Sequence, residues 1–114
     1  MLTIDALRLF GANVQEGLER CMNNESFYLR MVRIAQQDQK IATLAPLVEA
    51  KSYHEAFEVA HALKGVFGNL ALTPLTEPVS EITEHLRYGE DIDYGPLLER
   101  IQTAKEQLDS IAAE

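Results

Sequence analysis

The sequence predicts an all-α fold, namely an antiparallel up-down four-helix bundle with additional short helices at its N-terminus. Apolar residues recur three and four positions apart along nearly the whole chain, which is the periodicity of helices packed on a core. Period-two alternation and clusters of β-branched residues, the signals of strands, are missing. The connections between helical stretches are short, so successive helices should pack as antiparallel neighbours. We expect residues 1–114 to form a single domain, because this length suits one core.

The first half of the chain predicts three helical stretches. Asn13 and Glu16 have the spacing of a capping box, which opens a helix over NVQEGLERCM. A second stretch follows a cap at Asn23 or Asn24. In a third stretch, Pro46 should kink or divide the helix. The apolar residues of the second and third stretches are Phe27, Val32, Ile34, Ala35, Ile41, Leu44 and Val48.

The second half predicts three longer helices. Ser52 and Glu55 form another capping-box pair and begin a helix that runs through Phe57, Ala60, Leu63 and Phe67. Thr73 followed by Pro74 is typical of a cap and a first helical residue, although Pro78 offers an alternative start one turn later. The segment YGEDID is a turn before the last helix. The inner face of the helix after Thr73 is marked by Leu75, Val79, Ile82 and Leu86, and the apolar residues of the last helix are Leu97, Leu98, Ile101, Leu108 and Ile111.

Composition excludes several classes of function. The formal net charge of −8 argues against a nucleic-acid partner, because phosphate backbones require a basic surface. No run approaches the ~20 apolar residues of a membrane span, and the N-terminal segment lacks the features of a signal peptide. Cys21 is the single cysteine and fits a reducing compartment. We therefore expect a cytoplasmic protein that binds neither nucleic acid nor membrane.

The segment from His61 to Leu72, HALKGVFGNLAL, concentrates the residues suited to chemistry. On a helix, Lys64, Gly65 and Gly68 share a face with His61 because they follow it by three, four and seven positions. Each glycine in a helix costs roughly 1 kcal/mol relative to alanine, so an exposed pair needs a reason. The pair is explained if a partner must approach the imidazole closely.

This group of residues suits phosphoryl chemistry. A neutral imidazole nitrogen is a nucleophile near neutral pH. A phosphoryl group on it would carry roughly two negative charges, which the Lys64 ammonium one turn away would offset. The sequence therefore predicts a nucleophile, a cation and a cleared approach on one helix face.

The run His61-Ala62-Leu63-Lys64-Gly65, continuing through Gly68-Asn69-Leu70, resembles the H-x-L-K-G core of the histidine phosphotransfer (HPt) domain family. The resemblance extends to Gly17-Leu18, to Phe27-Tyr28 and to the helix from Leu75 to Leu86. Two positions depart from it: Ala71 stands where the family commonly has glycine, and Phe67 where it has a small residue. We expect Ala71 to alter the following turn only slightly, and Phe67, Phe57 and Leu63 to be core.

The resemblance implies a phosphorelay intermediate that carries a phosphoryl group on His61 between the aspartates of receiver domains, with a hybrid sensor kinase as a further partner. It implies phosphorylation on Nε2, phosphate stabilisation by Lys64 and docking over Gly65 and Gly68. Relatives often hydrogen-bond the imidazole from the next helix, which points to Thr83; Glu58 is a second candidate. The chain would act as a monomeric carrier with no cofactor of its own, since the receiver would supply Mg²⁺. No phosphate-binding glycine loop is present, so we expect no ATP-dependent kinase activity.

Two other interpretations stay open. The chain could be a helical interaction module that has the same fold but does not transfer phosphate. Glu58-x-x-His61 also has the spacing found in di-metal carboxylate bundles. Those sites need a second such motif, which His85 does not provide because glutamates precede it by one and four positions. We therefore expect no metal site, and we expect His54 and His85 to be solvated polar residues.

Overall fold

The computed structural model describes residues 1–113, which form seven helices and no strand. Two short helices come first, α1 (Ile4–Phe10) and α2 (Val14–Arg20). Then follow α3 (Glu25–Gln36), α4 (Ile41–Glu49), α5 (Tyr53–Asn69), α6 (Thr73–Arg87) and α7 (Gly95–Ala113). The all-α prediction is confirmed.

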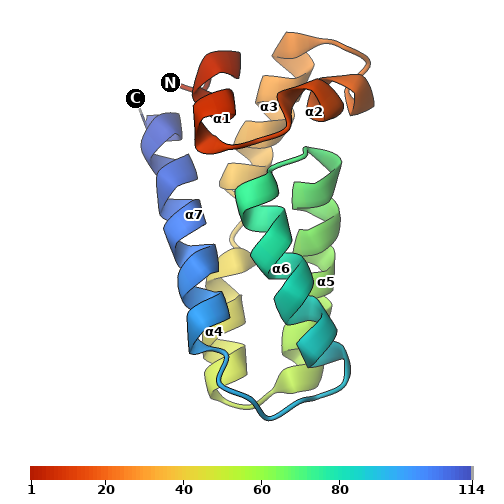
Figure 1. Ribbon diagram of the computed structural model, residues 1–114, viewed down its shortest axis with the longest axis vertical. Helices are drawn as coiled ribbons and strands as arrows, with labels where there is room; N and C mark the ends of the chain where they lie inside the picture. The colour runs from red at the N-terminus through yellow and green to blue at the C-terminus, as the bar shows by residue number, and fades with distance from the viewer. Residues whose placement is uncertain (114) are drawn as a thin grey trace.

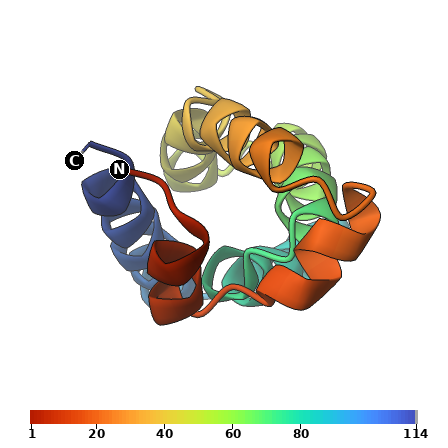
Figure 2. The same cartoon turned by 90° about the horizontal axis from the view of Figure 1, so that it is seen from above.

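The bundle has four rods, and its first rod is made of two helices. In Figure 1, α3 and α4 follow one another along the long axis, beside the longer α5, α6 and α7. Seen from above in Figure 2, the rods form a ring in the order α3 with α4, α5, α6 and α7, while α1 and α2 lie across one end. The predicted up-down bundle with short N-terminal helices is thus what the structure has.

The break in the first rod lies at residues 37–40, between the second and third predicted stretches, and the division expected at Pro46 does not occur. In the turn between the two helices, the Asp38 carboxylate accepts a hydrogen bond from the Lys40 amide at 2.8 Å. Pro46 sits in the sixth position of α4, which continues through it. Pro78 likewise lies inside α6 and is buried there, so it does not reset the start of that helix.

Three of the four predicted N-cap residues occupy the N-cap position, but only two of them make a capping hydrogen bond with their side chain. Asn13 and Asn24 both cap as expected, with side chains that accept hydrogen bonds from the amides of Glu16 and Phe27. Ser52 occupies the N-cap position of α5, but its side chain makes no capping hydrogen bond. Thr73 is not a cap: α6 begins at Thr73 itself, and Leu72 precedes it as the N-cap residue.

The core runs along the inside of the four rods. Leu63 and Phe67 of α5 are fully buried, as predicted, and so are Leu75, Val79 and Ile82 of α6. Phe57 is an exception to the predicted core, because it lies at the rim and is only partly buried. The core face of α5 is buried, whereas His61 lies on the exposed face of the same helix.

Candidate functional site

The centre of α5 forms the floor of a shallow surface depression. Its lining comes from three helices: His61, Lys64, Gly65, Gly68 and Asn69 of α5, Thr76 of α6, and Glu16 and Arg20 of α2. The sequence predicted that four of these residues share a face, and the structure brings all four together at one site. The contributions of Glu16 and Arg20 from α2 and of Thr76 from α6 were not predicted.

The imidazole of His61 is exposed and is held from one side by an aromatic ring. The Phe57 ring, one turn earlier on α5, stacks on it with centroids 5.6 Å apart and an interplanar angle of 20°. The Arg87 guanidinium lies over the same Phe57 ring, 4.9 Å from its centroid. The stacked Phe57 ring limits the orientations that the imidazole can adopt.

The two glycines leave open surface beside His61. A Cβ atom at Gly65 would meet nothing within 4 Å, and one at Gly68 would meet only the Thr76 methyl group at 3.9 Å. Packing within the protein therefore does not require glycine at either position. Because glycine is a poor helix former, these residues cost the isolated helix free energy without relieving a clash.

The two candidates for a hydrogen bond to the imidazole make other contacts. The Thr83 side chain is fully buried, and its hydroxyl donates its single proton to the Val79 carbonyl at 2.6 Å. Glu58 pairs with His54 instead, with Oε1 2.9 Å from Nε2. The expectation that either residue orients His61 is thus not met in this structure. Thr83 is turned inward because its neighbours Val79 and Ile82 face the core.

Glu84 is an exposed residue of α6 that is level with His61 along the bundle. Two contacts give the antiparallel register of α5 and α6: Arg87 lies over Phe57, and Gly68 faces Thr76. Moving one turn forward from Phe57 to His61 corresponds to moving one turn back from Arg87, to positions 83 and 84. Position 83 is buried, whereas Glu84 is exposed, so that Glu84 is the accessible one of the two α6 residues level with His61.

The electrostatics agree with this placement. Glu84 accepts hydrogen bonds from Arg87, from Nη2 at 3.2 Å and from Nε at 3.4 Å. The hydrogen bond from Arg87 lowers the pKa of Glu84, and the charges of Arg87, Lys64 and His61 lower it further. Glu84 is thus within electrostatic range of His61 and Lys64 as well as of Arg87. The sequence gives only a weak signal for Glu84, because its position relative to His61 depends on the register between α5 and α6.

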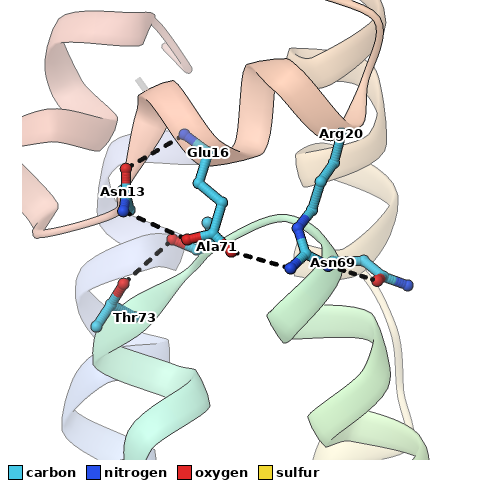
Figure 3. Close-up of polar contacts among 6 residues, drawn as sticks. All are labelled: Asn13, Glu16, Arg20, Asn69, Ala71 and Thr73. Atoms are coloured by element: carbon cyan, nitrogen blue, oxygen red, sulfur yellow. Dashed lines mark hydrogen bonds and ion pairs between the residues drawn. The ribbon is translucent and has the colours of Figure 1, made fainter.

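A polar rim on α2 borders the other end of the depression (Figure 3). Arg20 joins α2 to α5, donating to Glu16 Oε1 at 3.0 Å and to Asn69 Oδ1 at 3.3 Å. The Asn13 amide donates to the Ala71 carbonyl at 2.9 Å, which ties the start of α2 to the turn after α5. These contacts hold α2 at a fixed position relative to the glycine face.

The turn after α5 has the geometry of a Schellman motif without its usual glycine. The Leu72 amide donates to the Phe67 carbonyl, and the Ala71 amide donates to the Gly68 carbonyl, at 3.0 and 3.1 Å. Ala71 adopts a φ of 53°, in the left-handed region. The departure at Ala71 thus leaves the turn intact, as expected, with an alanine in a conformation that glycine adopts more easily.

The other two histidines lie away from this depression. His54 is exposed, in keeping with the prediction, and pairs with Glu58. His85 is only about one-third exposed, and its Nδ1 lies 2.6 Å from Glu90 Oε2, so a carboxylate and not solvent is its main polar neighbour. Residues 1–113 contain no group of three or more His, Cys, Asp or Glu side chains arranged to hold a metal ion. None of the helices described is both long enough and apolar enough to span a membrane.

Comparison with known protein families gives a match over most of the chain. The family model described as "Hpt domain" matches residues 29–111, which include α4 to α6 and most of α3 and α7. Comparisons with curated proteins and with solved structures gave no match. The family match covers His61, the glycine face and the α6 residues beside them, whereas α1 and α2 precede it. Hpt domains are histidine phosphotransfer modules of phosphorelay signalling that interact with receiver domains, and this chain belongs to the Hpt domain family.

Proposed function

We propose that this protein carries a phosphoryl group on His61, receiving it from the phosphoaspartate of one receiver domain and passing it to the aspartate of another. The observation that carries the proposal is the open glycine face beside an exposed imidazole. Gly65 and Gly68 relieve no clash within the chain. The space that they leave open is therefore explained by a partner that binds there. A receiver that brings its aspartate to His61 needs this space.

The chemistry follows from the imidazole. The lone pair of a neutral ring nitrogen, which we take to be Nε2, attacks phosphorus, while the bond between phosphorus and the aspartyl oxygen breaks. The carboxylate leaves with the bonding electrons, and the ring becomes a phosphorylated imidazolium. In the onward transfer the same bonds change in reverse order. Lys64 offsets charge on the phosphoryl oxygens from one turn away.

Each partner has a separate part in this scheme. This chain provides the nucleophile, the adjacent cation and the docking surface, and it has no cofactor of its own. The receiver provides Mg²⁺, which offsets charge on the transferring group. A monomer in the cytoplasm suffices, with receiver domains or a hybrid sensor kinase as partners. ATP is not a direct donor in this scheme.

Phosphotransfer from labelled receiver domains tests the proposal. We expect the parent protein to acquire an acid-labile label, and His61→Gln to acquire none while it keeps its helical content and melting temperature. His54→Gln is the matched control, because His54 is an exposed histidine two turns earlier on the same helix. Label that persists on His61→Gln would refute the assignment. A parent protein that binds receivers but is never labelled would be an interaction module without phosphotransfer.

A further inference from the structure

The Glu84 carboxylate on α6 has no role in the phosphotransfer scheme proposed for His61. A carboxylate is an unfavourable neighbour for a phosphoryl group, because the two negative charges repel each other. Glu84 is nevertheless held there by two hydrogen bonds from Arg87, whose guanidinium is itself fixed over the Phe57 ring that stacks on His61. The chain of contacts from His61 through Phe57 and Arg87 to Glu84 keeps the carboxylate near the site of phosphorylation.

We propose that Glu84 destabilises the phosphorylated form of His61 and thereby shifts the phosphotransfer equilibrium towards the aspartate of the receiver. The inference rests on the proposed function, since it concerns how firmly His61 retains the group that it carries. Glu84 would act through charge alone, without touching the transferred group. It is therefore a tuning residue of the site and not a catalytic one.

The charge balance of the transfer gives the direction of the effect. A neutral imidazole becomes a phosphorylated imidazolium, in which a positive ring bears a dianionic group, so one net negative charge is added next to Glu84. When the group leaves for the receiver, the bond between nitrogen and phosphorus breaks, an oxygen–phosphorus bond forms, and this net charge leaves the surface. A fixed carboxylate beside His61 favours the second state over the first.

The other charged groups around His61 set the size of the effect. Lys64 on α5 and Arg87 on α6 oppose Glu84, and Arg20 and Glu16 at the rim on α2 already pair with each other. The Glu84 and Arg87 side chains are 54% and 39% exposed, so water and salt screen the interaction without abolishing it. We therefore expect a moderate effect that depends on ionic strength.

The first test measures how label divides between this protein and a receiver at equilibrium. Glu84→Gln should raise the ratio of phosphorylated His61 to phosphorylated receiver about three- to tenfold at low salt, and less at high salt. Arg87→Gln should lower this ratio, because it removes the opposing positive charge. Glu81→Gln is the matched control, since Glu81 lies on the same helix but pairs with Arg100 of α7.

The second test needs no partner. His61 is phosphorylated chemically with phosphoramidate, and the ³¹P resonance of the product is followed with pH. In Glu84→Gln the pKa for the second proton of the phosphoryl group should be lower by about 0.3–1 unit, which is a two- to tenfold change in the acid dissociation constant. The pKa falls because the variant lacks a negative charge that opposes formation of the dianion. Glu81→Gln should titrate like the parent.

The two tests separate this inference from the proposed function. If the parent exchanges no label with any receiver, the proposed function fails, whatever the ³¹P titration shows. If the parent exchanges label normally, while Glu84→Gln leaves both the partition and the ³¹P titration unchanged, the role of Glu84 is refuted. Shifts in both measurements for Glu84→Gln, with neither for Glu81→Gln, support it.

Discussion

At the scale of single residues, the protein has glycines at two positions where its own packing does not require them. Gly65 and Gly68 lie in α5 on the face of His61, and added Cβ atoms would meet open space or an ordinary contact. Each glycine lowers helix stability relative to alanine. Under the proposed function, stability and receiver binding make opposite demands at these positions, and this opposition can be measured.

Replacing Gly68 tests that opposition. Gly68→Gln should raise the free energy of unfolding slightly, by up to about 1 kcal/mol, because glutamine is the better helix former. The same substitution should slow phosphotransfer and weaken receiver binding, because the new side chain occupies the approach to His61. Thermal melts and transfer rates on one preparation provide both values. A variant that melts no lower and transfers at the parental rate would show that this position does not clear a path.

At the scale of elements, one close contact packs α2 against α3. Gly17 of α2 lies against the Tyr28 ring of α3, and a Cβ atom there would be 2.5 Å from Cε1. Tyr28 cannot easily give way, because it is fully buried and its hydroxyl donates to the Leu70 carbonyl at 2.9 Å. Gly17 is thus a packing glycine, unlike the two beside His61.

Alanine substitutions distinguish the two kinds of glycine. Gly17→Ala should lower the free energy of unfolding by roughly 1–3 kcal/mol, because overpacking outweighs the gain in helix propensity. Gly65→Ala should raise it by up to about 1 kcal/mol, since nothing lies within 4 Å of the added atom. Urea denaturation of the two variants measures both changes. Equal effects of the same sign would show that the contact with Tyr28 does not restrict position 17.

At the scale of the whole molecule, Tyr28 connects α3 to the turn after α5, so its ionisation affects the assembled bundle. Burial raises the pKa of Tyr28 to about 12, and charge repulsion from Cys21 adds to the shift. The phenol therefore stays neutral in the folded protein at a pH where it ionises in the unfolded chain. The stabilisation from this difference is complete below pH 10, the ordinary pKa of the phenol, and disappears as pH rises through about 12.

Alkaline titration of stability tests this role. The parent should lose roughly 2–3 kcal/mol through Tyr28 between pH 10 and 12, in proportion to the shift in its pKa. Tyr28→Phe should be less stable at pH 7, by about 1 kcal/mol for the lost hydrogen bond, but should show a flatter decline above pH 10. Burial also raises the pKa values of Tyr53 and Tyr94, which contribute equally in both proteins. Parallel curves for parent and variant would exclude the proposed effect.

The sequence by itself determined what depends on one helix at a time. His61, Lys64, Gly65 and Gly68 share a face because of their spacing along α5, and helical spacing alone predicts this. The same reasoning predicted the all-α class, the core position of Phe67 and the caps at Asn13 and Asn24. In each case the relevant interactions lie within a few residues of one another.

Only the tertiary structure decided what depends on how helices are rotated and aligned. Thr83 and Glu84 are adjacent in sequence, yet packing turns Thr83 into the core and leaves Glu84 beside His61. Arg20 reaches the site because α2 crosses the end of α5, forty-nine residues away along the chain. Rotation and register result from many side chains of several helices packing at once, and no local pattern in the sequence records their combined outcome.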